Sequence, residues 1–186
     1  AYEIPKRDWS SDVCSSDLNA LLCESGCQLS DEQVERAQRR HSDAYRRLSD
    51  SMKPLPGASK LLTHLTEARV PWAIATSGRL ENARPALEAL GVADTATVIT
   101  RDEVDRAKPD PDLFIAAAER IKAPIETAIV VGDSVWDLLA ARRAGALGVG
   151  LLSGGYGQDE LERAGAYRVY QDPADLLRHL DEVGVR

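Results

Sequence analysis

The stretch TAIVVGDSVWD, residues 127–137, decides the fold of this chain. It opens with a short apolar run rich in β-branched side chains, which predicts a strand buried on both faces. The run leads directly into Gly132 and Asp133, and a helix over residues 134–144 is expected to end at Gly145. A buried strand, a polar turn and a helix in this order are typical of a parallel sheet covered by helices.

The same alternation extends outward from this stretch in both directions. Further strands are expected at 70–76, 97–100, 146–152 and 167–170. Helices are expected at 30–48, 58–68, 80–90, 112–122, 158–164 and 173–183. The first of them begins with Ser30 and Gln33 at the spacing of a capping box. We therefore predict an α/β protein with a doubly wound, Rossmann-like parallel sheet.

The composition is that of an ordinary soluble globular protein, with 44% hydrophobic and 28% charged residues among 186. The net charge of -7 argues against nucleic acid as a partner, because no basic face is available to release counterions from a polyanion. No apolar run approaches the ~20 residues of a membrane span, and no basic-then-apolar leader opens the sequence. We expect a cytoplasmic protein without a membrane partner, and the sequence leaves its oligomeric state open.

Ligands of a parallel sheet bind beyond the carboxyl ends of its strands, so the polar residues that follow predicted strands are the candidates for a site. The first group is Thr76-Ser77-Gly78, which follows the strand expected at 70–76. A hydroxyl followed by small residues can present one O–H and successive backbone N–H groups to a phosphate. A helix N-cap is the alternative interpretation, since Ser and Thr favour that position.

The second group is Lys108-Pro109-Asp110-Pro111-Asp112. A lysine in a loop stiffened by proline offers a fixed positive charge to a phosphoryl group, whereas an isolated lysine in a turn is more often a surface residue. The third group is Asp133 and Asp137, one helical turn apart at the end of the clearest strand. Two carboxylates placed in this way converge and suit Mg²⁺. Alternatively, Asp133 caps the helix and Asp137 is solvated.

In this order, the three groups resemble three motifs of the haloacid dehalogenase superfamily. The matching stretches are VPWAIATSG (70–78), AKPDPDLF (107–114) and IVVGDSVWDLLAARRAG (129–145). The resemblance runs from about residue 29 to the C-terminus. The KPxPD and GDSxxD patterns are similar to those of the phosphoglycolate phosphatase and beta-phosphoglucomutase branch.

The resemblance implies a Mg²⁺-dependent phosphatase that hydrolyses small phosphomonoesters through an aspartyl-phosphate intermediate. In that family Thr76 would bind a phosphoryl oxygen with Ser77 and Gly78 beside it, and Lys108 would neutralise the phosphate and the nucleophile. Asp133 would ligate Mg²⁺, and Asp137 would ligate it or hold its waters. The partner would be a small phosphorylated metabolite.

Other readings stay open within the same fold. A phosphomutase differs from a phosphatase only in its cap and in the access of solvent, and a catalytically silent member could serve in binding. The pair Asp133 and Asp137 argues against a haloacid dehalogenase, which works without Mg²⁺. The lysine loop argues against a response-regulator receiver. The segment Ser153–Gly157 could form the rim of the site, but we expect an ordinary turn there.

The first motif of the family, an apolar strand followed by Asp-x-Asp, is expected upstream of residue 29 and does not occur there. Its first Asp is the nucleophile and its second the general acid and base. Asp110-Pro111-Asp112 has the required spelling, but it lies in the lysine loop with the wrong flanking residues. The chain is therefore expected to lack its nucleophile.

The segment from Arg7 to Leu18 resembles the translation of a DNA-sequencing adapter, and its hydrophobic residues have no periodicity. We interpret residues 1–18 as an artefactual segment, 19–53 as the remnant of a helical cap and 54–186 as an α/β core that lacks its first strand. A natural linker rich in Ser and Asp is the alternative interpretation of the adapter-like stretch. A chain without its first strand would have a gap in its sheet and would be poorly soluble and inactive. The three cysteines near this end, for which no fourth ligand is at hand, are expected to be free thiols: Cys14, Cys23 and Cys27.

Overall fold

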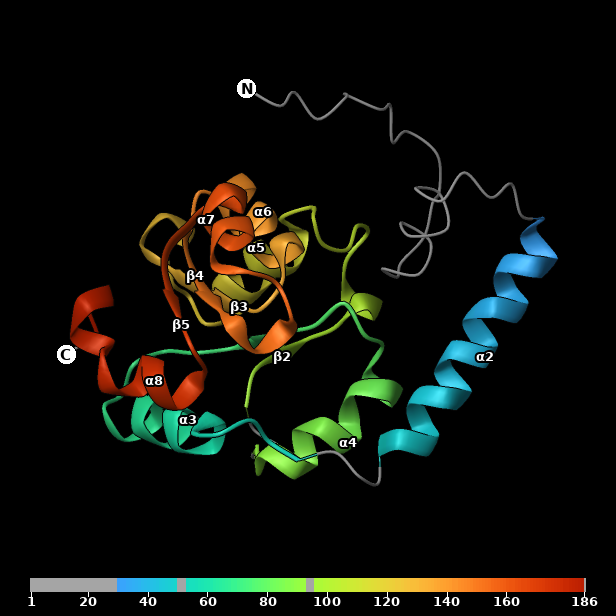
Figure 1. The fold of residues 1–186 in the computed structure, drawn as a ribbon, viewed down its shortest axis with the longest axis horizontal. Coiled ribbons are helices and arrows are strands. Elements are labelled where there is room, and N and C mark those ends of the chain that lie inside the picture. Colours follow the sequence, from blue (N-terminus) through green and yellow to red (C-terminus); the bar gives the residue numbers. More distant parts are fainter. Residues whose placement is uncertain (1–29, 50–52, 93–95, 186) are drawn as a thin grey trace.

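The computed structural model of the chain describes residues 30–49, 53–92 and 96–185 (Figure 1). The adapter-like segment, the three cysteines and the first part of the expected cap remnant lie outside these residues, as does the side chain of His41. Within them, the strands and helices follow each other nearly in the predicted order.

The strands form two parallel sheets. A three-stranded sheet has the order β3-β4-β5, from β3 (Ile129–Gly132), β4 (Leu147–Leu151) and β5 (Ala166–Tyr170). A two-stranded sheet consists of β1 (Ile74–Ala75) and β2 (Val98–Ile99). The parallel α/β class is therefore confirmed, whereas the single continuous sheet is replaced by two.

The helices lie between these strands along the chain. They are α2 (Asp31–Ser49), α3 (Ala58–Glu67), α4 (Leu80–Leu90), α5 (Asp112–Arg120), α6 (Val135–Ala144), α7 (Gln158–Ala164) and α8 (Pro173–Arg178). Four short 3₁₀ turns connect them within the described ranges: η1 (Arg101–Glu103), η2 (Ile125–Thr127), η3 (Leu152–Gly154) and η4 (Leu180–Val183).

Two predicted elements are wrong in extent. The strand expected at 70–76 is reduced to Ile74 and Ala75, because the N–H of Val70 still bonds to the carbonyl of Leu65 behind α3 and Pro71 has no N–H to give. The single helix expected at 173–183 is interrupted by His179, whose ring stacks on Tyr170 at 5.8 Å between centroids. The charged, helical surroundings of the histidines predict surface positions for them; His64 is exposed accordingly, whereas His179 is partly buried.

The three-stranded sheet is covered on both faces, as a doubly wound fold requires. On one face, Val130 packs with Phe114 of α5 and with Ala140 and Ala141 of α6. On the other face, Val149 belongs to a cluster that includes Leu61 of α3, Leu176 of α8 and Leu180 of η4. Successive residues of a strand point to opposite faces, so Ile129 and Val130 serve the two clusters in turn.

The facing edges of the two sheets have no strand between them in the described part of the chain. The N–H groups of Ile74 and Thr76 donate hydrogen bonds to the carbonyls of Thr97 and Ile99, so the backbone of Ala75 faces away from β2. On β3, Ala128 bonds to Leu147 of β4, so the backbones of Ile129 and Val131 face away from that sheet.

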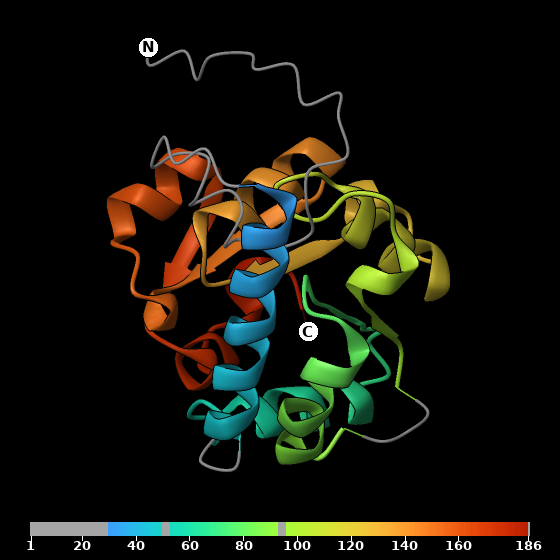
Figure 2. The ribbon, with the colours of Figure 1, turned by 90° about the vertical axis from the view of Figure 1, so that its right-hand side faces the viewer.

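The two edges nevertheless belong to one region of the molecule. Ala75 of β1 packs against the cluster that contains Val130 of β3, and α5 contacts β1, β2 and α6 (Figure 2). At the same place the side chain of Val131 remains 43% exposed, which is unusual for a valine of an α/β sheet. The described residues therefore leave an apolar surface uncovered beside the outer edge of β3.

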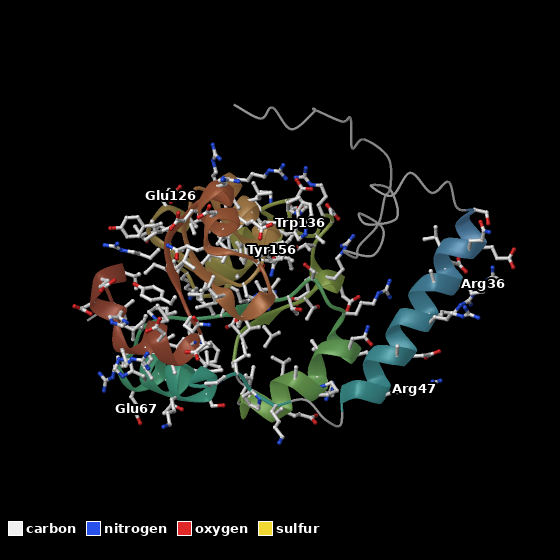
Figure 3. The ribbon with its side chains drawn as sticks, viewed as in Figure 1. Arg36, Arg47, Glu67, Glu126, Trp136 and Tyr156 are labelled. Atoms are coloured by element: carbon white, nitrogen blue, oxygen red, sulfur yellow. The ribbon has the colours of Figure 1, made fainter. Side chains whose placement is uncertain are left out.

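Helix α2 stands apart from these layers and contacts α4 (Figure 1). It is strongly charged, and Arg36 and Arg47 are exposed along its length (Figure 3). Its sequence has a charged face and few apolar residues, which predicts a solvated helix, and the exposed arginines agree with this. Among the helices described, none is both long and apolar enough to cross a membrane.

Val149 and Val131, which are paired in register on β4 and β3, are predicted to differ in their contribution to stability. Val149→Ala removes buried methyl groups from a fully covered position and should lower the free energy of unfolding by about 2 kcal/mol. Val131→Ala should cost at least about 1 kcal/mol less, because this side chain is already in contact with water. Urea unfolding of the two variants measures the difference, and equal losses would contradict an uncovered β3.

Candidate functional site

The centre of the candidate site is an ion pair between Lys108 and Asp137. The ammonium nitrogen Nζ lies 2.7 Å from Oδ1 of Asp137, and the two side chains are only 15% and 10% exposed. The same ammonium donates a hydrogen bond to the carbonyl oxygen of Ala75 at 3.1 Å and lies 5.1 Å from the ring centre of Phe114. Residues from β1, the loop before α5, and α6 thus meet at one positive charge.

Asp137 is fixed from its other side by the start of α6. Its Oδ2 accepts hydrogen bonds from the backbone N–H of Ser134 at 3.1 Å and from the hydroxyl of Ser134 at 2.7 Å. The hydroxyl oxygen of Ser134 in turn accepts from the N–H of Asp137 at 3.2 Å, which completes a capping box. Ser134 is therefore the N-cap of this helix, in the place that the alternative reading gave to Asp133.

Gly132 permits this arrangement because it has no Cβ, so the side chain of Asp137 can lie against its backbone. A Cβ at this position would lie 2.3 Å from Cβ of Asp137 and 2.8 Å from its Oδ2, well inside van der Waals contact. The φ angle of Gly132 is not in the left-handed region, so the need for glycine here comes from the contact rather than from the backbone conformation.

Asp133 is half-buried between these groups, and the pKa of its carboxyl is raised from the ordinary value of 3.8. Burial is the largest cause, and the negative charge of Asp137 adds to it; the backbone N–H of Asp133 and the ammonium of Lys108 act in the opposite direction. The site therefore holds two carboxylates beside one ammonium, and an added cation would be favoured there.

The residues Thr76, Ser77 and Gly78 follow β1 at its carboxyl end, as predicted. The hydroxyl oxygen of Thr76 accepts a hydrogen bond from the N–H of Gly78 at 3.1 Å, which holds this turn closed. Ala75, the residue before Thr76, is the one that binds Lys108. The turn and the ammonium are thus neighbours, although helix α4 begins only after Arg79 and the turn does not cap it directly.

The lysine loop is held by arginines. The guanidinium of Arg143 donates to the carbonyl of Pro109 at 3.0 Å, and the Lys108–Pro109 peptide bond is cis. The guanidinium of Arg106 lies 3.2 Å from Asp112 and 3.7 Å from Asp110. The only Asp-x-Asp in the sequence is therefore engaged by Arg106 in the loop that presents Lys108.

The structure thus brings Lys108, Asp133 and Asp137 together and sets Thr76 beside them. Sequence reasoning missed Ser134, although a Ser three residues before an Asp is a capping-box pattern and could have revealed it. It also missed Ala75, whose contact uses only a backbone carbonyl and leaves no signal in the sequence. The roles of Thr76, Ser77, Gly78, Lys108, Asp133 and Asp137 in binding remain predictions.

The residues present fit a Mg²⁺ ion only in part. In the described ranges, no three His, Cys, Asp or Glu side chains form a group that could hold a metal by themselves. Mg²⁺ is, however, usually bound by one or two carboxylates together with waters and substrate phosphate. Asp133, a half-buried oxygen donor, fits this pattern. Asp137 is occupied by Lys108 and Ser134, so it is better placed to orient the lysine or a metal-bound water.

Comparison with known proteins gives one family and several relatives. The family model of the haloacid dehalogenase-like hydrolases matches residues 6–145. The Phosphoglycolate phosphatase of Caulobacter vibrioides is 33% identical over 154 residues, which cover 82% of this chain and 65% of that protein. Other curated relatives are matched over only 45% and 52% of their own length, so the chain spans about half of them.

Two solved structures are similar along most of the chain. A hydrolase from Pseudomonas syringae is 53% identical, with a TM-score of 0.85 over 89% of this chain and 76% of that one. A HAD family hydrolase from Deinococcus radiodurans R1, solved with bound phosphate and sodium, is 27% identical, with a TM-score of 0.69 over 95% of this chain and 79% of that one.

Removal of the ammonium is predicted to be costly for folding. Lys108→Met leaves the buried carboxylate of Asp137 without its counter-ion and should lower the free energy of unfolding by about 3–5 kcal/mol. Lys60→Met, which removes an exposed charge, should change it by less than about 0.5 kcal/mol. In the double variant with Asp137→Asn, part of the loss should be recovered. Strictly additive losses in this cycle would show that the pair is not coupled.

Asp133→Asn is predicted to stabilise the protein near neutral pH. Because the pKa of Asp133 is higher in the folded than in the unfolded state, the folded state binds the proton more tightly and loses stability as pH rises from about 3.8 through the folded pKa. The variant lacks this loss, so its Tm should exceed that of the parent chain by a few degrees at pH 7.

The same difference should shrink as the pH falls through the raised pKa of Asp133 and disappear below about 3.8, where the carboxyl is protonated in the folded and the unfolded state alike. Asp181→Asn removes an exposed carboxylate of equal charge and is the matched control, whose Tm should stay close to that of the parent chain. A Tm for Asp133→Asn at or below that of the parent at pH 7 would contradict the burial of an unfavourable charge at this position.

Proposed function

Because the chain belongs to the haloacid dehalogenase-like hydrolases, we propose that it is the phosphate- and metal-binding part of a Mg²⁺-dependent phosphatase. The reaction proposed for the whole enzyme is hydrolysis of a small phosphomonoester through an aspartyl-phosphate intermediate. The protein solved with phosphate and the relative named Phosphoglycolate phosphatase support a small phosphorylated metabolite as the substrate class.

The observation that carries this proposal is the fixed ammonium of Lys108. The Lys108 side chain is only 15% exposed, and a carboxylate, a carbonyl and an aromatic ring hold its ammonium in one place, so the charge is preorganised. It lies at the carboxyl end of parallel strands, where ligands of this fold bind. A phosphoryl group beside it would gain most as negative charge develops on its oxygens during transfer.

The other residues have complementary roles in the proposal. Thr76, Ser77 and Gly78 would offer hydroxyl and backbone N–H donors to the phosphoryl oxygens, after the Thr76–Gly78 hydrogen bond opens. Asp133 would bind Mg²⁺, which supplies Lewis-acid stabilisation of the phosphoryl oxygens. Asp137 would keep the ammonium of Lys108 in place and hold a water of the metal.

The reacting carboxylates are not in this chain, and we propose that the strand which carries them in the whole enzyme belongs between β1 and β3. The unpaired edges, the exposed Val131 and the Lys108 ammonium on the carbonyl of Ala75 support this position. The division into an artefactual segment 1–18, a cap remnant 19–53 and an incomplete core 54–186 follows from the same proposal.

A phosphomutase of the same fold and a catalytically silent binding protein are the alternatives. The engagement of Asp110 and Asp112 by arginines favours a binding role for this exact chain, since no other Asp-x-Asp is available. The coding DNA upstream of Asn19 shows whether the natural protein is an enzyme, either phosphatase or phosphomutase, or a binding protein. An Asp-x-Asp after an apolar strand there indicates an enzyme, and its natural absence a binding protein.

The chain as given is predicted to lack phosphatase activity. With p-nitrophenyl phosphate and Mg²⁺, its turnover should equal that of its own Asp133→Ala variant, because no nucleophile is present. When an Asp-x-Asp strand from the undamaged gene is restored, Mg²⁺-dependent turnover should appear. Lys108→Met should then lower kcat about 10²–10³-fold. Turnover by the unrestored chain that Asp133→Ala abolishes would contradict the assignment of a missing nucleophile.

A further inference from the structure

The turn η3, which sequence patterns assign to an ordinary connection, lies against the residue that follows β3. A Cβ placed on Gly154 would be 2.0 Å from the carbonyl oxygen of Asp133, and 2.8 Å from both its carbonyl carbon and its Cγ. No real Cβ approaches backbone atoms this closely. Gly154 therefore touches the main chain and the side chain of Asp133 at once.

This glycine is required by contact and not by conformation. The φ angle of Gly154 is outside the left-handed region, so the backbone itself would accept an alanine. Its neighbour Gly155 shows the opposite case, with φ at +85° and open space around its Cα. Position 154 therefore requires glycine because of a contact, and position 155 favours it because of backbone conformation. Only Gly154 is in contact with Asp133.

Both sides of the contact are anchored. Before η3, Leu151 is buried in the core, and after it Tyr156 packs on the cluster of Leu138 and Leu161. On the other side, the turn of Asp133 is held by the capping box that begins at Ser134. A side chain at position 154 could therefore be accommodated only by a shift of one turn. The turn of Asp133 has more room, because no described strand lies beyond β3.

We infer that Gly154 is a positioning residue, which sets where the carboxylate of Asp133 is held relative to Lys108 and Asp137. The inference rests on the proposed role of Asp133 in binding a divalent cation. Outer-shell residues of this kind usually change metal affinity about 10–100-fold when they are altered. The loop after β4 would then be part of the site, although it contributes no ligand atom.

The test compares Gly154→Ala with Gly157→Ala in the chain itself. Gly157 is in the same loop, but a Cβ there would meet only the end of the Glu160 side chain at 3.4 Å, with φ at −74°. The probe is Mn²⁺, followed by paramagnetic broadening of assigned amide resonances. In the parent chain, broadening should centre on Asp133. Gly154→Ala should need about 10–100-fold more Mn²⁺ for equal broadening, and Gly157→Ala no more than the parent.

Spectra without metal separate this inference from the proposed function. Gly154→Ala should move the amide resonances of Ser134 and Asp137, while those of β5 and α8 stay in place; Gly157→Ala should move neither set. If the parent chain shows no broadening near Asp133, the proposed role of Asp133 in metal binding fails. The metal-free shifts of Ser134 and Asp137 in Gly154→Ala still test whether Gly154 positions Asp133. Unchanged Ser134 and Asp137 resonances, or parental Mn²⁺ dependence, in Gly154→Ala would overturn it.

A measurement on the unsubstituted chain covers the case in which Gly154→Ala does not fold. The contact predicts a nuclear Overhauser effect between the α-protons of Gly154 and the β-protons of Asp133. Its presence supports the inference, and its absence from an otherwise complete spectrum would overturn it.

Discussion

A lysine ammonium that is almost withdrawn from water must be paired, and this constraint organises the rest of the molecule. Lys108 satisfies it with the carboxylate of Asp137 and the carbonyl of Ala75. Because these partners come from α6 and β1, the pair links the two sheets at their carboxyl ends. The arginine contacts of the lysine loop and the capping box of α6 then serve to keep this charge in one place.

Under the proposed function, the charges around this pair would suit the binding of a cation and a phosphate together. Asp133 adds a second carboxylate to a region with one ammonium, and burial together with Asp137 raises its pKa. A divalent cation would offset the cost of the buried negative charge on Asp133. A phosphoryl group could then interact with both the cation and Lys108. If Asp133 binds a metal as proposed, stability and binding would be opposed at this residue, as is common where a fold holds a functional charge.

In the described residues, β1 and β3 each have one edge without a neighbouring strand, and both edges lie near Lys108. Parallel strands of α/β proteins are normally covered on both faces and paired inside the sheet. Here Val131 is exposed and Ala75 uses its free carbonyl for a lysine instead of a neighbouring strand. The chain also matches two of its curated relatives over only 45% and 52% of their own length.

The sequence by itself determined the α/β class, the positions of most helices and the candidates Thr76, Lys108, Asp133 and Asp137, because periodicity and the residues after each strand are local signals. It did not determine the division into two sheets or the exposure of Val131, which depend on which strand edges meet. The contacts of Ala75 and Gly154 were decided only by the tertiary structure. Ala75 contributes a backbone carbonyl and Gly154 has no side chain, so neither contact produces a recognisable sequence pattern. Residues distant along the chain become neighbours through packing, and packing alone placed Gly154 against Asp133.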